Sequence, residues 1–159
     1  MKKILLLAVG ALVFPFAGRA NDVRSPVFGV TIPADYRQWA LIAPAHSPGF
    51  DEIRGVLGNP AAMNAYRAET LPFPDGAVLA KVSWRHVESG EFKGDFVPGA
   101  PTTLQFMVKD SQKYAATGGW GFGKFAGGKP VSEKEHQECF ACHQAHVKNH
   151  DFVFTRFAP

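Results

Sequence analysis

The chain has 159 residues, 46% of them hydrophobic, which is enough to build one domain with a sizeable apolar core. Its 17 Lys and Arg exceed its 14 Asp and Glu, but Lys2, Lys3 and Arg19 lie near the N-terminus, and the rest of the chain carries 14 charges of each sign. This balance argues against nucleic acid or an anionic membrane surface as a partner.

The first 20 residues are typical of a secretory signal peptide. The chain begins with two lysines after the initiator methionine, and residues 4–16 are mostly apolar. Gly18 and Ala20 place small residues at the −3 and −1 positions of a cleavage site. The apolar run is too short to span a bilayer. We therefore predict export to the periplasm and a mature chain, residues 21–159, that forms a single domain outside the membrane.

The apolar pattern of the mature chain predicts an antiparallel sheet with a few short helices. Apolar residues alternate with a period near two in five segments, which we predict as strands: 50–58, 77–87, 102–108, 119–125 and 151–157. Helices are predicted over 35–42, after the Asn59 N-cap with Pro60 at the first helical position, and over 111–117. With 16 Gly and 12 Pro, the chain is a predominantly antiparallel α+β protein and not a four-helix bundle.

The strand predicted over 77–87 carries Lys81 near its middle. Its alternating residues Val78, Ala80, Val82 and Trp84 share one face of the strand. Lys81 therefore lies on the opposite face. The solvated face of a half-buried strand is the usual place for a lysine.

Both cysteines of the chain lie in one short motif, Cys-Phe-Ala-Cys-His, which ends at His143. The C-x-x-C-H pattern is the signature of covalent haem attachment. Cys139 and Cys142 would form thioethers to the haem, and His143 would ligate the iron. Ser132 and Glu135 have the spacing of a capping box, so the motif is predicted to lie on a short helix.

Two other uses of the cysteines fit less well. A disulfide between them closes too small a loop to stabilise much. A zinc site would need further ligands, and only nearby histidines are available: His136, His143, His146 and His150. The motif therefore favours one haem c per chain, with zinc and a disulfide as the alternatives.

The sixth position of such an iron is predicted to be open. No methionine follows His143, whereas small electron-transfer cytochromes usually carry a methionine ligand downstream of the motif. Four upstream residues are the alternative ligands: Met63, Met107, His46 and His86. An open position implies ligand binding or chemistry at the iron.

Five segments of the chain, taken in order, resemble the cytochrome P-460 family. They are DYRQWA (35–40), FDEIRGV (50–56), PDGAVLAK (74–81), CFACH (139–143) and FVFTRFAP (152–159). The resemblance extends over nearly the whole mature chain. It implies a mainly antiparallel sheet, a homodimer, and one haem c per subunit with an open distal site.

The family contains two functional types, and the resemblance leaves both open. The P-460 enzymes oxidise hydroxylamine with a lysine bonded to the haem edge, and "DGAVLAK" places Lys81 at that position. The cytochromes c′-β lack this cross-link and bind NO and CO in an apolar pocket capped by phenylalanine. The enzymes also carry a distal arginine, matched by Arg54, and a distal glutamate, which Gln105 replaces here.

The sequence thus leads to a gas-binding c-type cytochrome, with Phe50 and Phe73 as candidates for the distal cap. Because glutamine does not transfer protons near neutral pH, Gln105 favours binding of NO or CO over catalysis. The first alternative is a hydroxylamine-oxidising enzyme that uses Lys81 and passes electrons to a partner cytochrome. The second is an electron carrier with a six-coordinate iron.

Overall fold

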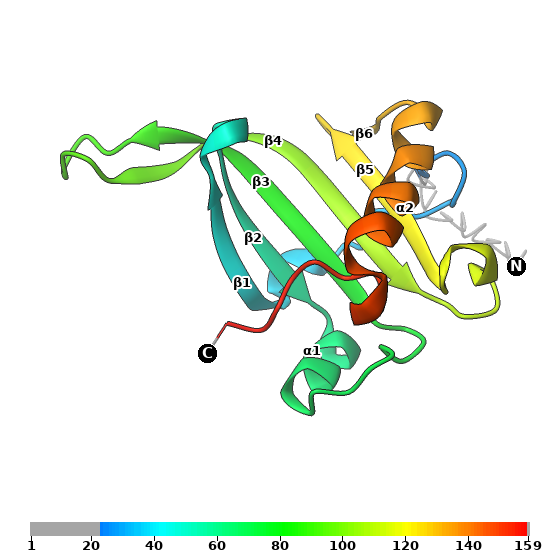
Figure 1. The fold of residues 1–159 in the computed structure, drawn as a ribbon. Helices are drawn as coiled ribbons and strands as arrows, with labels where there is room; N and C mark the ends of the chain where they lie inside the picture. The colour runs from blue at the N-terminus through cyan, green and yellow to red at the C-terminus, as the bar shows by residue number, and fades with distance from the viewer. Residues whose placement is uncertain (1–22, 159) are drawn as a thin grey trace, which may run out of the picture.

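The computed structural model describes residues 23–158, and its centre is a six-stranded antiparallel sheet in which the strands follow chain order (Figure 1). The strands are β1 Ala40–Ser47, β2 Glu52–Gly58, β3 Val78–Glu88, β4 Phe96–Lys109, β5 Trp120–Ala126 and β6 Lys129–Pro130. Helix α1, Pro60–Arg67, connects β2 to β3, and α2, Glu133–Val147, follows β6. The α+β class with a predominantly antiparallel sheet is therefore confirmed, while the predicted signal peptide lies outside the described residues.

Helix α1 begins where the sequence predicted, and Asn59 shows why. Its side-chain oxygen accepts hydrogen bonds from the backbone N–H groups of Ala62 and Val78, both at 3.0 Å. Its side-chain amide donates to the carbonyl oxygen of Gly76 at 2.8 Å. Asn59 therefore caps the helix and ties it to the start of β3.

Two predicted helices are shorter in the structure. The helix predicted over 35–42 is only a 3₁₀ turn, Tyr36–Gln38, because the chain from Ala40 onward pairs with β2 instead. The segment 111–117 forms only the 3₁₀ turn Ala115–Thr117, which ends at Gly118 with a positive φ of 66°.

The strand predicted over 151–157 is absent from the described chain. Asp151 and Phe152 have φ angles of 48° and 62°, in the left-handed region that interrupts an extended strand. The backbone hydrogen bonds here are local instead: Phe152 N donates to Val147 O and Val153 N donates to His150 O, both at 3.0 Å. This C-terminal segment crosses the sheet beside α2 (Figure 1).

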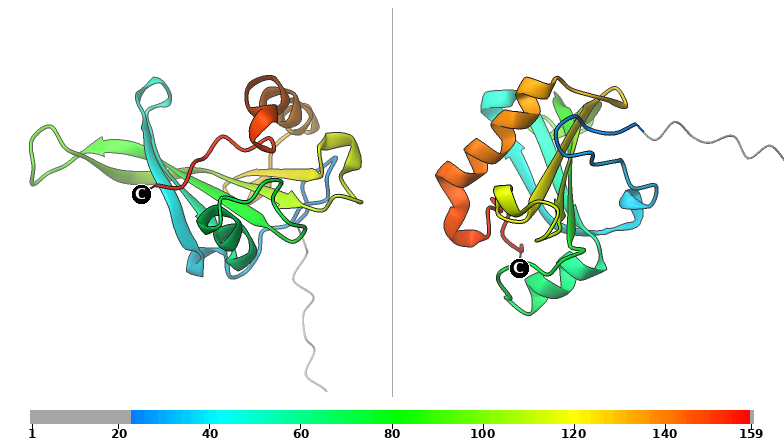
Figure 2. Two further views of the ribbon diagram at one scale, coloured as in Figure 1. Left: turned by 60° about the horizontal axis from the view of Figure 1, so that its bottom comes forward. Right: turned by 90° about the vertical axis from the view of Figure 1, so that its right-hand side faces the viewer.

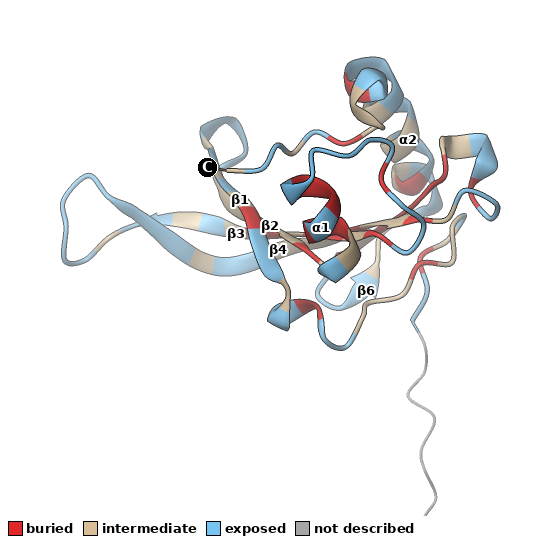
Figure 3. Cartoon of the chain, turned by 90° about the horizontal axis from the view of Figure 1, so that it is seen from below, coloured by how far each residue is buried: buried red, intermediate tan, exposed pale blue. Residues whose placement is uncertain are grey.

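The sheet is covered on both faces. Figure 2 shows α2 on one face and the N-terminal segment on the other. On the first face, residues of β3 and β5 join α1 in an apolar cluster that includes Met63, Leu79 and Trp120, and Cys139 packs against it. On the second face, Val30 and Tyr36 pack against Phe106 and Phe125. The burial pattern in Figure 3 reflects this, with buried positions on α1 and along the middle of the strands.

The outer parts of β3 and β4 leave the sheet as a two-stranded arm, residues 85–100 (Figure 1). The pairing of the two strands shifts register on both sides of Trp84, where the arm begins. The arm carries apolar side chains that are largely exposed: Val87, Phe92, Phe96 and Val97. It is therefore an apolar projection that the rest of the described chain does not cover.

Candidate haem-binding site

Helix α2 presents the C-x-x-C-H motif, and its first turn is fixed by the predicted capping box. Ser132 Oγ accepts a hydrogen bond from Glu135 N, and Glu135 Oε2 accepts one from Ser132 N, each at 3.3 Å. Glu135 also forms an ion pair with Lys124 of β5 at 3.0 Å. The capping box confirms the predicted start of the helix, which is longer than the short helix expected from the sequence.

His136 attaches α2 to the sheet and is completely buried. Its Nδ1 lies 2.9 Å from the carbonyl oxygen of Ser132, which can only accept, so Nδ1 carries the proton. Its Nε2 then accepts a hydrogen bond from the backbone N–H of Lys124 at 3.0 Å. Both ring nitrogens are thus occupied, and His136 is not available as a zinc ligand.

The two cysteines are free thiols on α2. Cys139 is half-buried against the apolar cluster, and this burial raises the pKa of its thiol, whereas Cys142 is exposed. Within residues 23–158, no group of three or more His, Cys, Asp or Glu side chains is arranged to hold a metal ion. The described chain therefore gives no support to the zinc alternative.

His143 follows the cysteines and is held in one tautomer. Its Nδ1 lies 2.6 Å from the carbonyl oxygen of Phe152 in the C-terminal segment, so Nδ1 donates and Nε2 keeps its lone pair. Burial lowers the pKa of His143, which favours the neutral ring that metal ligation requires. The rings of Phe122 and Phe154 lie 5.1 Å and 4.8 Å from the imidazole. Two free thiols beside an imidazole with an available Nε2 are the donor set that haem c needs.

Lys81, Gln105 and Arg54 lie on the same face of the sheet as α2. The register aligns Lys81 of β3 with Gln105 of β4, and Gln105 with Lys124 of β5. Arg54 of β2 is paired with Ser83, two residues along from Lys81 on the same side of β3. Lys81 therefore lies on the opposite face of β3 from Ala80 and its alternating neighbours, as predicted.

The ammonium group of Lys81 is half-buried and lacks a hydrogen-bond or ion-pair partner among residues 23–158. Burial lowers its pKa, and the positive charge of Arg54 lowers it further. The Glu52 carboxylate and the Cys139 thiol act in the opposite direction. These couplings bring Lys81, Arg54 and Cys139 into one neighbourhood. In Figure 1, α2 lies over the β5 side of the sheet, and α1 packs near the end of β2 and the start of β3.

The two phenylalanines predicted for the distal cap occupy different environments. Phe50 is 74% exposed at the end of a 3₁₀ turn between β1 and β2. Phe73 is 3% exposed, and its ring contacts those of Tyr66 at 5.0 Å and Trp120 at 5.7 Å. The structure thus places Phe73 in the core and Phe50 at the surface, and a distal role for either stays a prediction.

The four alternative sixth ligands lie in the apolar cluster or at the base of the arm. Met63 is buried in α1, and Met107 is aligned with Phe122 in the apolar cluster. His46 Nε2 lies 2.7 Å from His86 Nδ1 at the base of the arm. His46 is paired with Ile53, whose side chain lies on the opposite face from that of Arg54.

The residues that hold the proximal side together were not predicted from the sequence. The Phe152 carbonyl gave no signal, because a backbone acceptor has no residue type. Phe122 and Phe154 lay within predicted strands, where an aromatic residue is expected in any case. Lys109 and Asp151, far apart in the sequence, form an ion pair at 2.8 Å that only the folded chain reveals.

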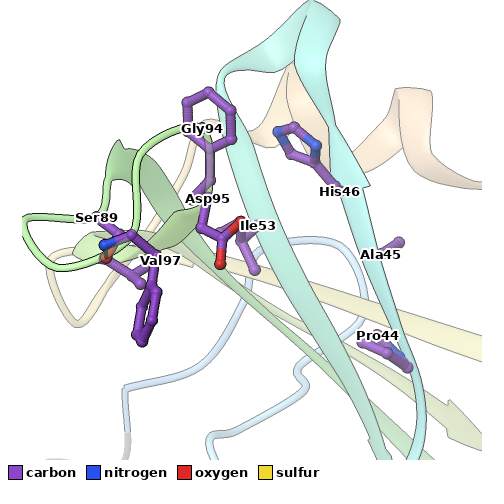
Figure 4. A pocket seen from close by; sticks show the side chains of 10 residues that line it. Pro44, Ala45, His46, Ile53, Ser89, Gly94, Asp95 and Val97 are labelled. Atoms are coloured by element: carbon purple, nitrogen blue, oxygen red, sulfur yellow. Dashed lines mark hydrogen bonds between the residues drawn. The ribbon is translucent and has the colours of Figure 1, made fainter.

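Two hollows in the surface lie away from the motif. The larger, of about 620 Å³, lies between β1 and the arm, and His46, Asp95 and Val97 are among its lining residues (Figure 4). The smaller, of about 430 Å³, lies between α1 and the C-terminal segment and is lined in part by Tyr66 and Phe73. Neither hollow is lined by the motif cysteines or His143.

Comparison with known families identifies the chain. Residues 33–155 match the family model described as Cytochrome P460. The chain belongs to the cytochrome P460 family. Membership in the cytochrome P460 family supports a haem-binding cytochrome with iron, in agreement with the motif on α2. No curated protein gives a significant match to the chain. Among residues 23–158, no helix is long and apolar enough to cross a membrane.

The attachment of α2 to the sheet can be tested at His136. Replacing His136 with Leu removes the acceptor for the buried Lys124 N–H and the donor to Ser132 O. We expect the free energy of unfolding to fall by about 1–3 kcal/mol, the usual cost of leaving a buried polar group without its partner. Urea unfolding measures this loss. The control is His146→Leu on the exposed side of the same helix; an equal effect of both substitutions would contradict the role of His136.

Proposed function

We propose that the protein is an exported cytochrome with one covalently attached haem c and an open sixth position that binds NO or CO. The single observation that carries this proposal is the hydrogen bond from His143 Nδ1 to Phe152 O beside two free thiols. It leaves Nε2 of His143 as a neutral ligand atom next to the groups that form thioethers. When bound, the haem supplies an iron centre for a diatomic ligand. Export rests on the signal-like residues 1–20.

The residues across from α2 support ligand binding more than oxidation. The row formed by Lys81, Gln105 and Lys124 contains two amines and an amide, and no carboxylate. The Gln105 amide can donate a hydrogen bond to a bound ligand but does not exchange a proton near neutral pH. Met63 is buried in α1, and His46 and His86 bond to each other at the base of the arm, which supports an external ligand at the sixth position.

A second candidate function is favoured by Lys81. Burial and Arg54 lower the pKa of Lys81, which increases the fraction of neutral, nucleophilic amine. An amine on the motif side of the sheet, with no partner among residues 23–158, supports a bond to the haem edge. In that case the protein would oxidise hydroxylamine and pass the electrons to a partner cytochrome, as the P-460 enzymes do.

A homodimer is proposed from the arm. Its apolar side chains are exposed, with Phe92 at 68% and Val97 at 41%. The hollow between the arm and β1 is lined in part by the same side chains, among them Phe92 and Val97 (Figure 4). An exposed apolar projection beside a hollow is a common feature of protein interfaces.

Covalent haem and ligand uptake test the leading proposal. We expect the wild-type protein, matured with the haem-attachment machinery, to keep one haem per chain after denaturation and, when reduced, to bind one CO per chain. Cys139→Ser/Cys142→Ser should lose all haem on denaturation, because no thioether forms. Haem-stained denaturing gels, the pyridine haemochrome spectrum and a CO titration measure these properties. Haem-loaded wild-type protein that takes up no CO when reduced would contradict the open site.

Intact mass separates the two candidate functions. The leading proposal predicts a mass that corresponds to the polypeptide plus haem with two thioethers. Lys81→Met should then change the mass only by the substitution and leave the ferrous Soret band in place. A wild-type mass that is lower by further hydrogens, together with a broadened and red-shifted Soret band, would indicate the cross-link. If Lys81→Met then returns the Soret band to its ordinary position, the cross-link is established and the leading proposal is rejected. Lys93→Met in the arm is the matched control.

The arm can be tested by charge. Phe92→Glu/Val97→Glu places two carboxylates on the apolar surface, so we expect the mass in solution to fall from that of a dimer to that of a monomer. Sedimentation velocity measures the change. Lys93→Glu, on the same turn but without loss of apolar surface, should stay dimeric. A monomeric wild type, or a double variant that remains dimeric, would contradict the proposed interface.

A further inference from the structure

A buried ion pair lies next to Phe152, whose carbonyl oxygen bonds to His143. Lys109, at the end of β4, places its ammonium group 2.8 Å and 2.9 Å from the two carboxylate oxygens of Asp151. Its third hydrogen bond goes to the carbonyl oxygen of Gly118 at 3.1 Å, and it lies 4.9 Å from the centre of the Trp120 ring. The two side chains are only 6% and 9% exposed. The ammonium group is thus fully bonded in a largely dry environment.

Asp151 is held by more than this lysine. Its Oδ2 accepts a hydrogen bond from the backbone N–H of Phe73 at 2.8 Å. Its carbonyl oxygen accepts one from the indole N–H of Trp120, also at 2.8 Å. Three parts of the chain therefore converge on Asp151: the end of β4, the start of β5 and the loop before β3. The position of this residue is fixed from several directions at once.

The backbone next to the pair is strained. Asp151 and Phe152 have left-handed φ angles of 48° and 62°, which residues other than glycine adopt only where their surroundings hold them. The Phe152 ring packs so closely on Gly118 that a β-carbon at Gly118 would overlap it. Gly118 therefore accepts the bond from Lys109 and also borders Phe152. This geometry sets the direction of the Phe152 carbonyl group.

We infer that the Lys109–Asp151 ion pair is a positioning element for the iron ligand. It holds the left-handed turn at Asp151 and Phe152, and the Phe152 carbonyl then accepts the proton of His143 Nδ1 at 2.6 Å. A hydrogen bond at Nδ1 fixes the ring and increases the basicity of Nε2, which stabilises ferric over ferrous iron. The ion pair would therefore act on a haem held by His143 only through Phe152 and His143. The inference rests on the proposed attachment of haem at His143.

The chemistry of buried ion pairs supports a positioning role over a purely stabilising one. Desolvation of two charges offsets most of their attraction, so apolar residues of similar size often stabilise a fold equally well. A charged pair at this point is better explained by the orientation that it gives to Asp151. Each oxygen of Asp151 accepts a hydrogen bond from a defined donor: Lys109, Phe73 or Trp120.

The test uses the haem-loaded protein and two variants. Asp151→Asn weakens the bond to Lys109, and Lys109→Met/Asp151→Asn removes both charges so that no unpaired ion stays buried. We expect both variants to show a more positive reduction potential and a lower iron–histidine stretching frequency in the ferrous resonance Raman spectrum. Asp75→Asn is the matched control, because its carboxylate bonds to Ser111 at the same end of β4 but not to the C-terminal segment. It should leave both quantities at the wild-type value.

The outcomes separate this inference from the proposed function. Haem-loaded variants with the wild-type potential and stretching frequency would overturn the positioning role, and so would an equal shift in Asp75→Asn. Wild-type protein without covalent haem, or without an iron–histidine band, would instead overturn the proposed function. If Asp151→Asn does not accumulate because it leaves Lys109 unpaired, the double variant decides.

Discussion

The hydrogen bond from His143 Nδ1 to the carbonyl oxygen of Phe152 joins the motif helix to the C-terminal segment, and the proximal side of the site depends on it. It selects the tautomer in which Nε2 is free to bind metal. This hydrogen bond requires α2 to be fixed on β5. His136 fixes the helix by bonding through both ring nitrogens. The hydrogen bond also requires the Phe152 carbonyl to point at the helix, which the ion pair of Asp151 supports.

The opposite side of the site comes from the sheet, and Lys124 joins it to α2 through the ion pair with Glu135. Register alone brings Lys81, Gln105 and Lys124 into a row, because paired residues of antiparallel strands share a face. Within residues 23–158, no hydrogen bond or ion pair joins Lys81 or Gln105 to α2. Lys81 and Gln105 can therefore vary without a direct effect on the bonds that hold the motif helix.

Local signals in the sequence predicted the parts of the structure that local contacts determine. The C-x-x-C-H spacing, the capping box at Ser132 and the cap at Asn59 involve residues within one helical turn, and the period-two strands follow from alternation. The chain over 151–157 also alternates, but Asp151 adopts a left-handed conformation that a distant lysine stabilises. The helix predicted over 35–42 was wrong for a similar reason, since pairing with β2 outweighed local propensity. Periodicity placed Lys81 on the correct face, but only the fold showed that α2 lies on that face.

The coordination state of the reduced iron tests the central claim most directly. Magnetic circular dichroism of the ferrous protein without added ligand distinguishes five-coordinate high-spin iron from six-coordinate low-spin iron. An open site with His143 as the protein ligand predicts the five-coordinate high-spin form. A six-coordinate low-spin spectrum would show that a second side chain binds the iron and would contradict this account.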